Sequence, residues 1–122
     1  MTLTATSLSA RYGRLPVCRN IDLSVSAGEY LVVLGANGAG KSSLLGALAG
    51  IVASSGAISL SGRRLDQTAA RVRAASGLVL VPEGRGNLFA PLTVEENLAI
   101  ALRHLPRAER REMLSETLAL FP

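Results

Sequence analysis

Alternating apolar and polar residues occur in three short stretches of the chain. Residues 2–10 alternate well enough to predict a half-exposed strand, and residues 21–25 (IDLSV) alternate clearly. Residues 56–62 (GAISLSG) repeat the pattern between two glycines. We therefore expect three strands, each with one side buried.

Two further stretches are apolar without alternation, as buried strands are. Residues 30–34 (YLVVL) follow a turn at residues 27–29 (AGE), and residues 78–81 (LVLV) end at Pro82. Both stretches are predicted to be strands inside the fold.

Helical spacing appears in three places. Apolar residues recur at this spacing from Leu44 to Gly50, where glycine predicts a stop. Thr93 and Glu96 form a capping box that opens a helix to about Arg103, and a second helix starts at Pro106. One stripe on this last helix is predicted to be core and not a cofactor site: Met113, Leu114, Leu118 and Phe121.

Composition indicates a globular α/β protein. The chain has 122 residues, enough for one domain with a core, and is 48% hydrophobic and 18% charged. No apolar run approaches the roughly 18 residues that a membrane span needs, and the N-terminus lacks the basic start of a signal peptide. We expect a cytoplasmic chain, with the single cysteine Cys18 a small buried residue.

The net charge of +4 makes nucleic-acid binding a candidate function, most of all through four arginines near the middle of the chain. Aromatic residues make up only 3%, which leaves little for base stacking. A solvated basic face is favoured over a nucleic-acid site for Arg63, Arg64, Arg71 and Arg73.

The clearest chemical signal is GANGAGKSS, residues 35–43, which contains the only lysine of the chain. It fits the phosphate-loop pattern G-x-x-x-x-G-K-[ST] between a predicted strand and a predicted helix. Glycines let successive N–H groups turn toward one anion, and the helix adds its positive end there. The predicted nucleotide-binding residues of this loop are Asn37, Gly38, Ala39, Gly40, Lys41, Ser42 and Ser43.

Two of these residues have distinct chemical roles. Lys41 is expected to reach the β- and γ-phosphates as a compact point charge, and the Ser42 hydroxyl is expected to ligate Mg²⁺. The side chain of Ser43 is expected to face the helix.

Several segments together resemble a known family. Tyr12-Gly13, residues 21–25, AGEYLVVLGANGAGKSSLLGALAG and SGAISLSGRRL look like the first half of an ABC-transporter ATPase subunit. More narrowly, LVPEGRGNLFAPLTVEENLAIA, residues 80–101, is similar to the ATP-binding subunits of branched-chain amino acid importers and their urea or amide relatives. The implied fold is α/β, that of a P-loop NTPase, with antiparallel strands beside the phosphate-loop core and residues 1–122 as the N-terminal portion of one nucleotide-binding domain.

The resemblance assigns roles to two residues outside the loop. Tyr12 is implied to stack on adenine, against the simpler interpretation of a core or strand-edge tyrosine. Glu83 occupies the position where most relatives carry a nucleotide-sensing glutamine and the branched-chain subfamily carries glutamate. From its place after residues 78–81 alone, Glu83 is also a candidate Mg²⁺ ligand.

Other family elements are missing. LSGRR, residues 60–64, resembles the LSGGQ signature but lies too near the phosphate loop, and we interpret it as structural. Neither Asp22 nor Asp66 ends an apolar strand, so the magnesium aspartate and the catalytic glutamate beside it are absent, and His104 does not match the switch histidine. We therefore expect an N-terminal fragment, with the C-terminal half absent, that does not hydrolyse ATP alone.

The resemblance implies the ATP-binding subunit of an importer that couples MgATP binding and hydrolysis to branched-chain amino acid uptake. Its implied partners are transmembrane permease subunits, which hold it at the cytoplasmic face of the membrane, and a second ATPase subunit in a head-to-tail dimer. The alternatives are an inactive nucleotide- or partner-binding module and a small P-loop kinase or GTPase.

Overall fold

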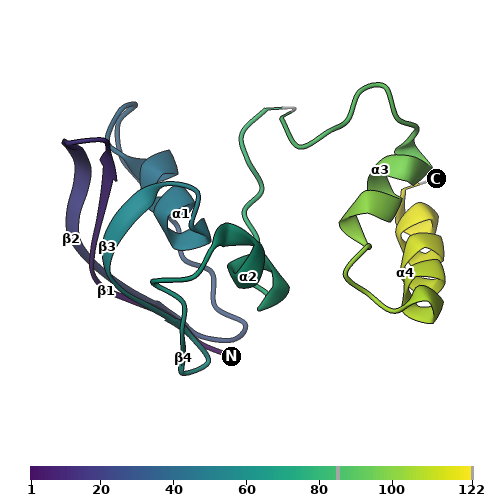
Figure 1. Ribbon diagram of the computed structural model, residues 1–122, viewed down its shortest axis with the longest axis horizontal. Coiled ribbons are helices and arrows are strands. Elements are labelled where there is room, and N and C mark those ends of the chain that lie inside the picture. The colour runs from purple at the N-terminus through teal and green to yellow at the C-terminus, as the bar shows by residue number, and fades with distance from the viewer. Residues whose placement is uncertain (85, 122) are drawn as a thin grey trace. The chain divides into compact units, whose positions relative to one another are not determined.

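The computed structural model describes residues 1–84 and 86–121, which form two compact units, Met1–Leu80 and Val81–Pro122 (Figure 1). The prediction that both belong to one nucleotide-binding domain stays a prediction.

A four-stranded antiparallel sheet in the order β2-β1-β3-β4 forms one side of the first unit. Its strands are β1 (Leu3–Tyr12), β2 (Leu15–Val25), β3 (Ala53–Leu60) and the short β4 (Arg63–Arg64). The three strands predicted from alternation are confirmed. β2 begins earlier than residues 21–25 because the tight turn after Tyr12 brings Leu15 directly opposite it.

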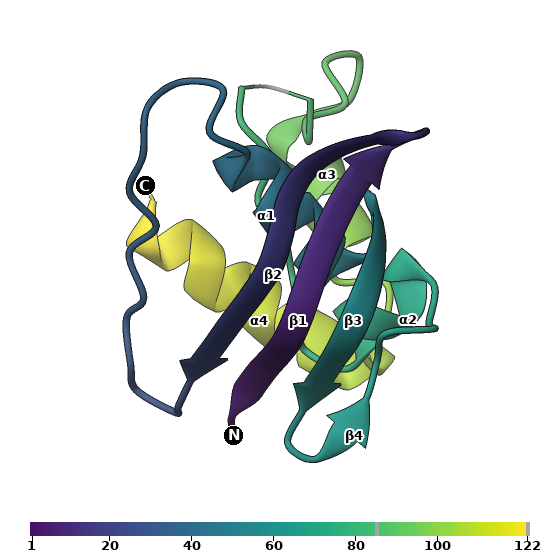
Figure 2. The ribbon, with the colours of Figure 1, turned by 90° about the vertical axis from the view of Figure 1, so that its left-hand side faces the viewer.

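Helix α1 (Lys41–Ala49) covers one face of this sheet, and Figure 2 shows it behind the strands. The helix ends, as predicted, at Gly50, whose left-handed φ of 78° lets its N–H bond back to the Ala47 and Gly46 carbonyls. Leu8 and Ala47 are completely buried where helix and sheet meet. The rest of the buried cluster is Ala5, Ala10, Leu44, Leu48, Ile58, Leu60 and Leu65.

The prediction of buried strands at residues 30–34 and 78–81 is wrong. Residues 30–34 and 78–81 run as extended coil, and Figure 2 shows the first of them beside the sheet without joining it. Tyr30 is 96% exposed and Val79 is 71% exposed. A strand exists only with a hydrogen-bonded neighbour, and no strand in the described part of the chain pairs with either segment. Only Val33 and Leu78 pack against the core.

The basic face is only partly as predicted. Arg63, Arg64 and Arg71 are exposed, but Arg73 is 3% exposed, so its assignment to a solvated face is wrong. Arg73 lies on α2 (Ala70–Ala75), a helix that the sequence pattern did not predict. Its guanidinium is buried because backbone carbonyls of the α1 end surround it.

LSGRR, residues 60–64, has a structural role in the sheet, as expected. The sequence forms the turn between β3 and β4, with Ser61 and Gly62 at φ angles of 53° and 80°. Positive φ at both central positions is typical of a tight hairpin turn.

The second unit contains α3 (Val94–Ala101) and α4 (Arg107–Leu120), close to their predicted bounds. The Thr93–Glu96 capping box is present in full. The predicted core stripe of α4 is wrong, because this helix has no buried residue: Met113, Leu118 and Phe121 are 44%, 41% and 77% exposed, and Leu114 is half-buried. None of the described helices is long and apolar enough to cross a membrane.

Two glycines allow a test of the sheet. Gly56 has φ of 103°, and a Cβ there would lie 2.5 Å from the Ser7 carbonyl oxygen of the neighbouring strand. Gly62 has φ of 80°, with nothing within 4 Å of a built Cβ. Gly62→Ala should cost about 1–2 kcal/mol of unfolding free energy from φ strain alone. Gly56→Ala should cost about 1–3 kcal/mol more, because β1 must move.

Chemical denaturation followed by circular dichroism measures both losses. Equal losses for the two variants would mean that β1 and β3 do not approach at Gly56 as described.

Candidate functional site

The loop at residues 35–40 leads directly into the first turn of α1. Its residues from Gly35 to Ala39 are exposed, and Gly38 and Gly40 have φ angles of 83° and 92°. These left-handed angles suit glycine, and within the loop the Ala39 N–H donates to the Ala36 carbonyl at 3.1 Å. The glycines thus lie where the loop turns, while its role in binding phosphate stays a prediction.

The amino end of α1 has no side-chain cap among the described residues. Its N-cap is Gly40, no side chain accepts a hydrogen bond from the first turn, and no acidic residue lies in that turn. By contrast, α3 begins with a complete capping box and two acidic residues. The first N–H groups of a helix need acceptors, so the start of α1 is suited to an anion from outside the chain.

Lys41 holds its ammonium group over the loop. Its Nζ donates to the carbonyl oxygens of Gly35 and Ala36, both at 2.8 Å. These contacts hold the cation against the first two residues of the loop that leads into the helix. A phosphate at the helix start would therefore meet N–H donors and a full positive charge together.

The two serines after Lys41 point in different ways. Ser42 is exposed, whereas Ser43 is 9% exposed and lies among the buried residues of α1. A ligand at the helix start can thus reach the hydroxyl of Ser42, as the prediction for Mg²⁺ requires. Ser43 faces inward, as expected, so that only its backbone N–H is available to a ligand.

The sheet fixes the position of the loop through Gly40. A Cβ on this residue would lie 2.7 Å from the Val17 carbonyl oxygen and 3.7 Å from Cβ of Cys18, so the loop lies against β2. Cys18, predicted to be buried, is half-buried.

Tyr12 lies at the end of the same hairpin. It pairs with Leu15, which is two residues, or roughly 7 Å, from Val17 along β2. Its side chain is 57% exposed, so it is not a core tyrosine. Tyr12 therefore presents an accessible aromatic ring on the strand pair that supports the phosphate loop.

Glu83 belongs to the second unit and is exposed. The remaining predicted site residues, Tyr12 and residues 37–43, all lie in the first unit. The structure thus brings the loop residues together on one support, while the role of Glu83 stays a prediction.

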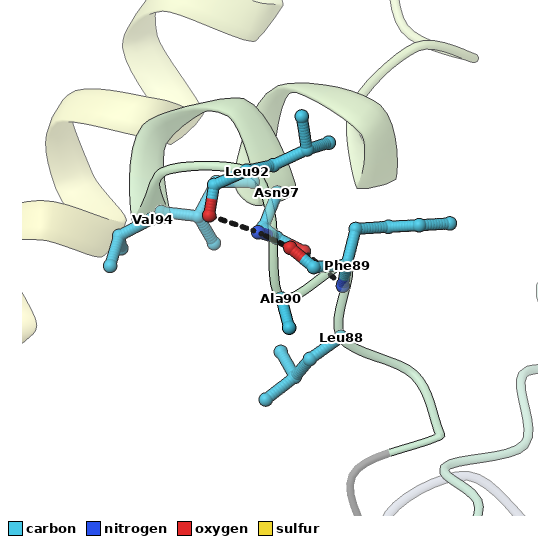
Figure 3. Close-up of a pocket in the computed structure, with 7 residues that line it drawn as sticks. Leu88, Phe89, Ala90, Leu92, Val94 and Asn97 are labelled. Carbon is cyan, nitrogen blue, oxygen red and sulfur yellow. Dashed lines mark hydrogen bonds between the residues drawn. The ribbon is translucent and has the colours of Figure 1, made fainter.

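Sequence reasoning missed a cavity in the second unit. It has a volume of about 280 Å³ and apolar walls, with Asn97 fixing the loop beside it. Figure 3 shows the Asn97 amide directed at the backbone of that loop, where it donates to the Phe89 and Leu92 carbonyls and accepts from the Phe89 N–H. In the sequence, the only indication of this cavity is an asparagine one turn into a capped helix. The lining residues are Leu88, Phe89, Ala90, Leu92, Val94, Asn97 and Leu98.

Comparison with known proteins supports the resemblance drawn from the motifs. Residues 18–121 match the ABC transporter family. The chain is 36% identical over 121 residues to the high-affinity branched-chain amino acid transport ATP-binding protein BraG of Pseudomonas aeruginosa, with 98% of this chain and 52% of the relative covered. It is 32% identical to the probable branched-chain amino acid transport ATP-binding protein LivF of Archaeoglobus fulgidus, with coverages of 98% and 51%.

Relatives with other names match as well. The sn-glycerol-3-phosphate import ATP-binding protein UgpC 1 of Rhizobium johnstonii is 35% identical over 108 residues, with 86% of this chain and 28% of the relative covered. The chain spans about half the length of the branched-chain relatives that it matches. With the phosphate loop, the α/β fold and the family match in agreement, the chain belongs to the ABC transporter family and has the P-loop NTPase fold of that family's ATP-binding domain.

Proposed function

We propose that this chain binds MgATP as part of the ATPase subunit of an ABC importer. The observation that carries the proposal is the start of α1, where an uncapped helix, a glycine loop and the Lys41 ammonium group meet. Each feature favours phosphate, and together they suit a polyphosphate better than a single carboxylate.

The individual roles follow from chemistry and position. Backbone N–H groups of residues 37–43 surround the phosphates, and Lys41 supplies the point charge. The hydroxyl of Ser42 would hold Mg²⁺, and the metal would supply positive charge to neutralise the phosphates. Tyr12 stacks on adenine, and Glu83 senses the nucleotide or approaches the metal.

The transported solute and the partners are the finer part of the proposal. The names of the two branched-chain relatives favour uptake of branched-chain amino acids. Permease subunits and a second ATPase subunit are the partners, and the subunit lies at the cytoplasmic face of the membrane through those permeases. The relative named for sn-glycerol-3-phosphate import is aligned over 86% of this chain. A transport assay is therefore the experiment that tests whether branched-chain amino acids are the solute.

One observation favours a second candidate, a module that binds nucleotide without hydrolysing it. The two aspartates of the chain have other partners: Asp22 Oδ1 accepts from the Ser7 N–H at 2.6 Å, and Asp66 bonds to Arg64 at 3.0 Å. Phosphoryl transfer depends on charges placed at the reacting groups, and removing one placed donor commonly costs about 10²–10³ in rate. ATP turnover by the chain separates the two candidates.

Lys41→Ala tests the phosphate site. Loss of a charge-assisted contact of roughly 1.5–3 kcal/mol should weaken ATP binding about tenfold or more. Arg63→Ala is the matched control, because it removes one exposed positive charge at β4 and should leave the affinity unchanged. Calorimetric titration of both variants, with and without Mg²⁺, makes the comparison. Equal ATP affinity in wild type and Lys41→Ala would refute the proposed site.

Tyr12→Ala tests the adenine contact. Removal of a stacking ring should cost about 1–3 kcal/mol of ATP binding, while Tyr12→Phe should be nearly silent because the π-face remains. Tyr30→Ala removes the chain's other tyrosine, which is 96% exposed, and should have no effect. If Tyr12→Phe loses as much affinity as Tyr12→Ala, the hydroxyl and not the ring is what matters.

Glu83→Gln separates nucleotide sensing from metal binding. If the phosphates are held by residues 37–43, the variant should keep its ATP affinity with and without Mg²⁺. Titration with the metal present and absent checks this. A loss seen only with Mg²⁺ would make Glu83 a metal ligand.

A further inference from the structure

Helix α1 is intrinsically weak. It has nine residues, with Gly46 in its interior and two serines in its first turn. Isolated helices shorter than about 12 residues are marginal in water, and an interior glycine costs about 1 kcal/mol relative to alanine. The order of α1 therefore depends on what contacts its face and its two ends.

The buried guanidinium of Arg73 completes the carboxyl end of this helix. Its Nη1 donates to the carbonyl oxygens of Ala47 and Leu48, both at 2.8 Å. The other nitrogens donate to the carbonyls of Thr68 and Asp66, at 3.2 and 3.1 Å. One side chain thus joins the last turn of α1 to the loop that precedes α2.

The surrounding backbone is shaped to admit this group. A Cβ on Gly50 would lie 2.9 Å from Arg73 Nε, so a larger residue would push the guanidinium away. The Arg73 carbonyl in turn accepts from the Leu78 N–H at 3.0 Å, which fixes the start of the coil at residues 78–81. Arg73 therefore connects α1 with the chain on either side of α2.

Two opposing effects act on the charge of Arg73. Burial lowers the pKa of Arg73, and the nearby Asp66 charge opposes that shift. The Asp66 carboxylate bonds to Arg64 and gives Arg73 only its backbone oxygen. The hydrogen bonds from Arg73 also place its charge at the negative end of the α1 dipole, while the positive end lies at the phosphate loop.

We propose that Arg73 is a positioning residue for the phosphate loop, acting through α1. The inference rests on the proposed nucleotide site at the amino end of that helix. A phosphate at one end and Arg73 at the other both stabilise the same helical state. Each therefore strengthens the effect of the other, as linkage requires.

Arg73→Gln in the full chain tests this by ATP titration. Glutamine keeps a side-chain donor but loses the charge and most of the hydrogen bonds, and we expect the dissociation constant for ATP to rise about fivefold to twentyfold. Arg110→Gln is the matched control, since Arg110, like Arg73, donates to backbone carbonyls, here those of Leu105 and Arg103, but in the second unit. It should leave ATP affinity unchanged.

The titrations are run at a temperature where circular dichroism shows the variants folded, so that a change in affinity is not a change in folded fraction. An Arg73→Gln affinity within twofold of wild type would overturn the proposal. Absence of ATP binding by wild type would remove the nucleotide site itself, which is a different failure.

If Arg73→Gln does not fold, amide hydrogen exchange on the wild-type chain tests the coupling between the two ends of α1. ATP should slow exchange not only at the loop but also at Gly50 and Leu78, whose N–H groups bond to Ala47 and Arg73. Protection confined to residues 35–45 would show that the two ends of α1 are uncoupled, and the proposal would fail.

Discussion

The structure of the first unit depends on the hydrogen-bond requirements of one short helix. The amino end of α1 has neither a side-chain cap nor an acidic residue, and its carboxyl end has the Gly50 cap and the carbonyl contacts of Arg73. The face between these ends is buried against the sheet through Leu44, Ala47 and Leu48. A helix so completed at one end and open at the other is well suited to hold an anion in place without moving itself.

The antiparallel sheet gives this helix a fixed support. Gly40 lies so close to the Val17 carbonyl that no other residue fits there, which ties the loop to β2 at one point. Register shifts near Ser7 and Asn20, both with φ of 50°, bend β1 and β2 while the hairpin still ends at Tyr12. The phosphate loop and an accessible aromatic ring are thereby carried on the same pair of strands.

The features predicted most accurately from the sequence are those that local interactions determine. The glycine loop, the stop at Gly50, the Thr93 capping box and the alternating strands each depend on residues within a few positions of one another. The strands at residues 30–34 and 78–81 were wrong because apolar character does not supply a pairing partner. Arg73 was misplaced for a similar reason, since the carbonyls that accept from it lie up to 26 positions away.

This division between local and distant interactions also separates the two parts of the proposed activity. The groups suited to phosphate lie within residues 35–43, and their geometry needs only the sheet and Arg73, all within the first unit. Hydrolysis depends in addition on charges placed at the reacting phosphate, and Glu83, the carboxylate proposed for the nucleotide or the metal, belongs to the second unit. The apolar coil segments at residues 30–34 and 78–81 are largely exposed, with Leu34 86% exposed and Val81 78% exposed, in a chain that spans about half the length of the branched-chain relatives. Exposed extended segments of this kind readily accept a neighbouring strand. The groups that we propose for nucleotide binding thus lie together in the first unit, whereas residues 30–34 and 78–81 have no strand beside them in the described part of the chain.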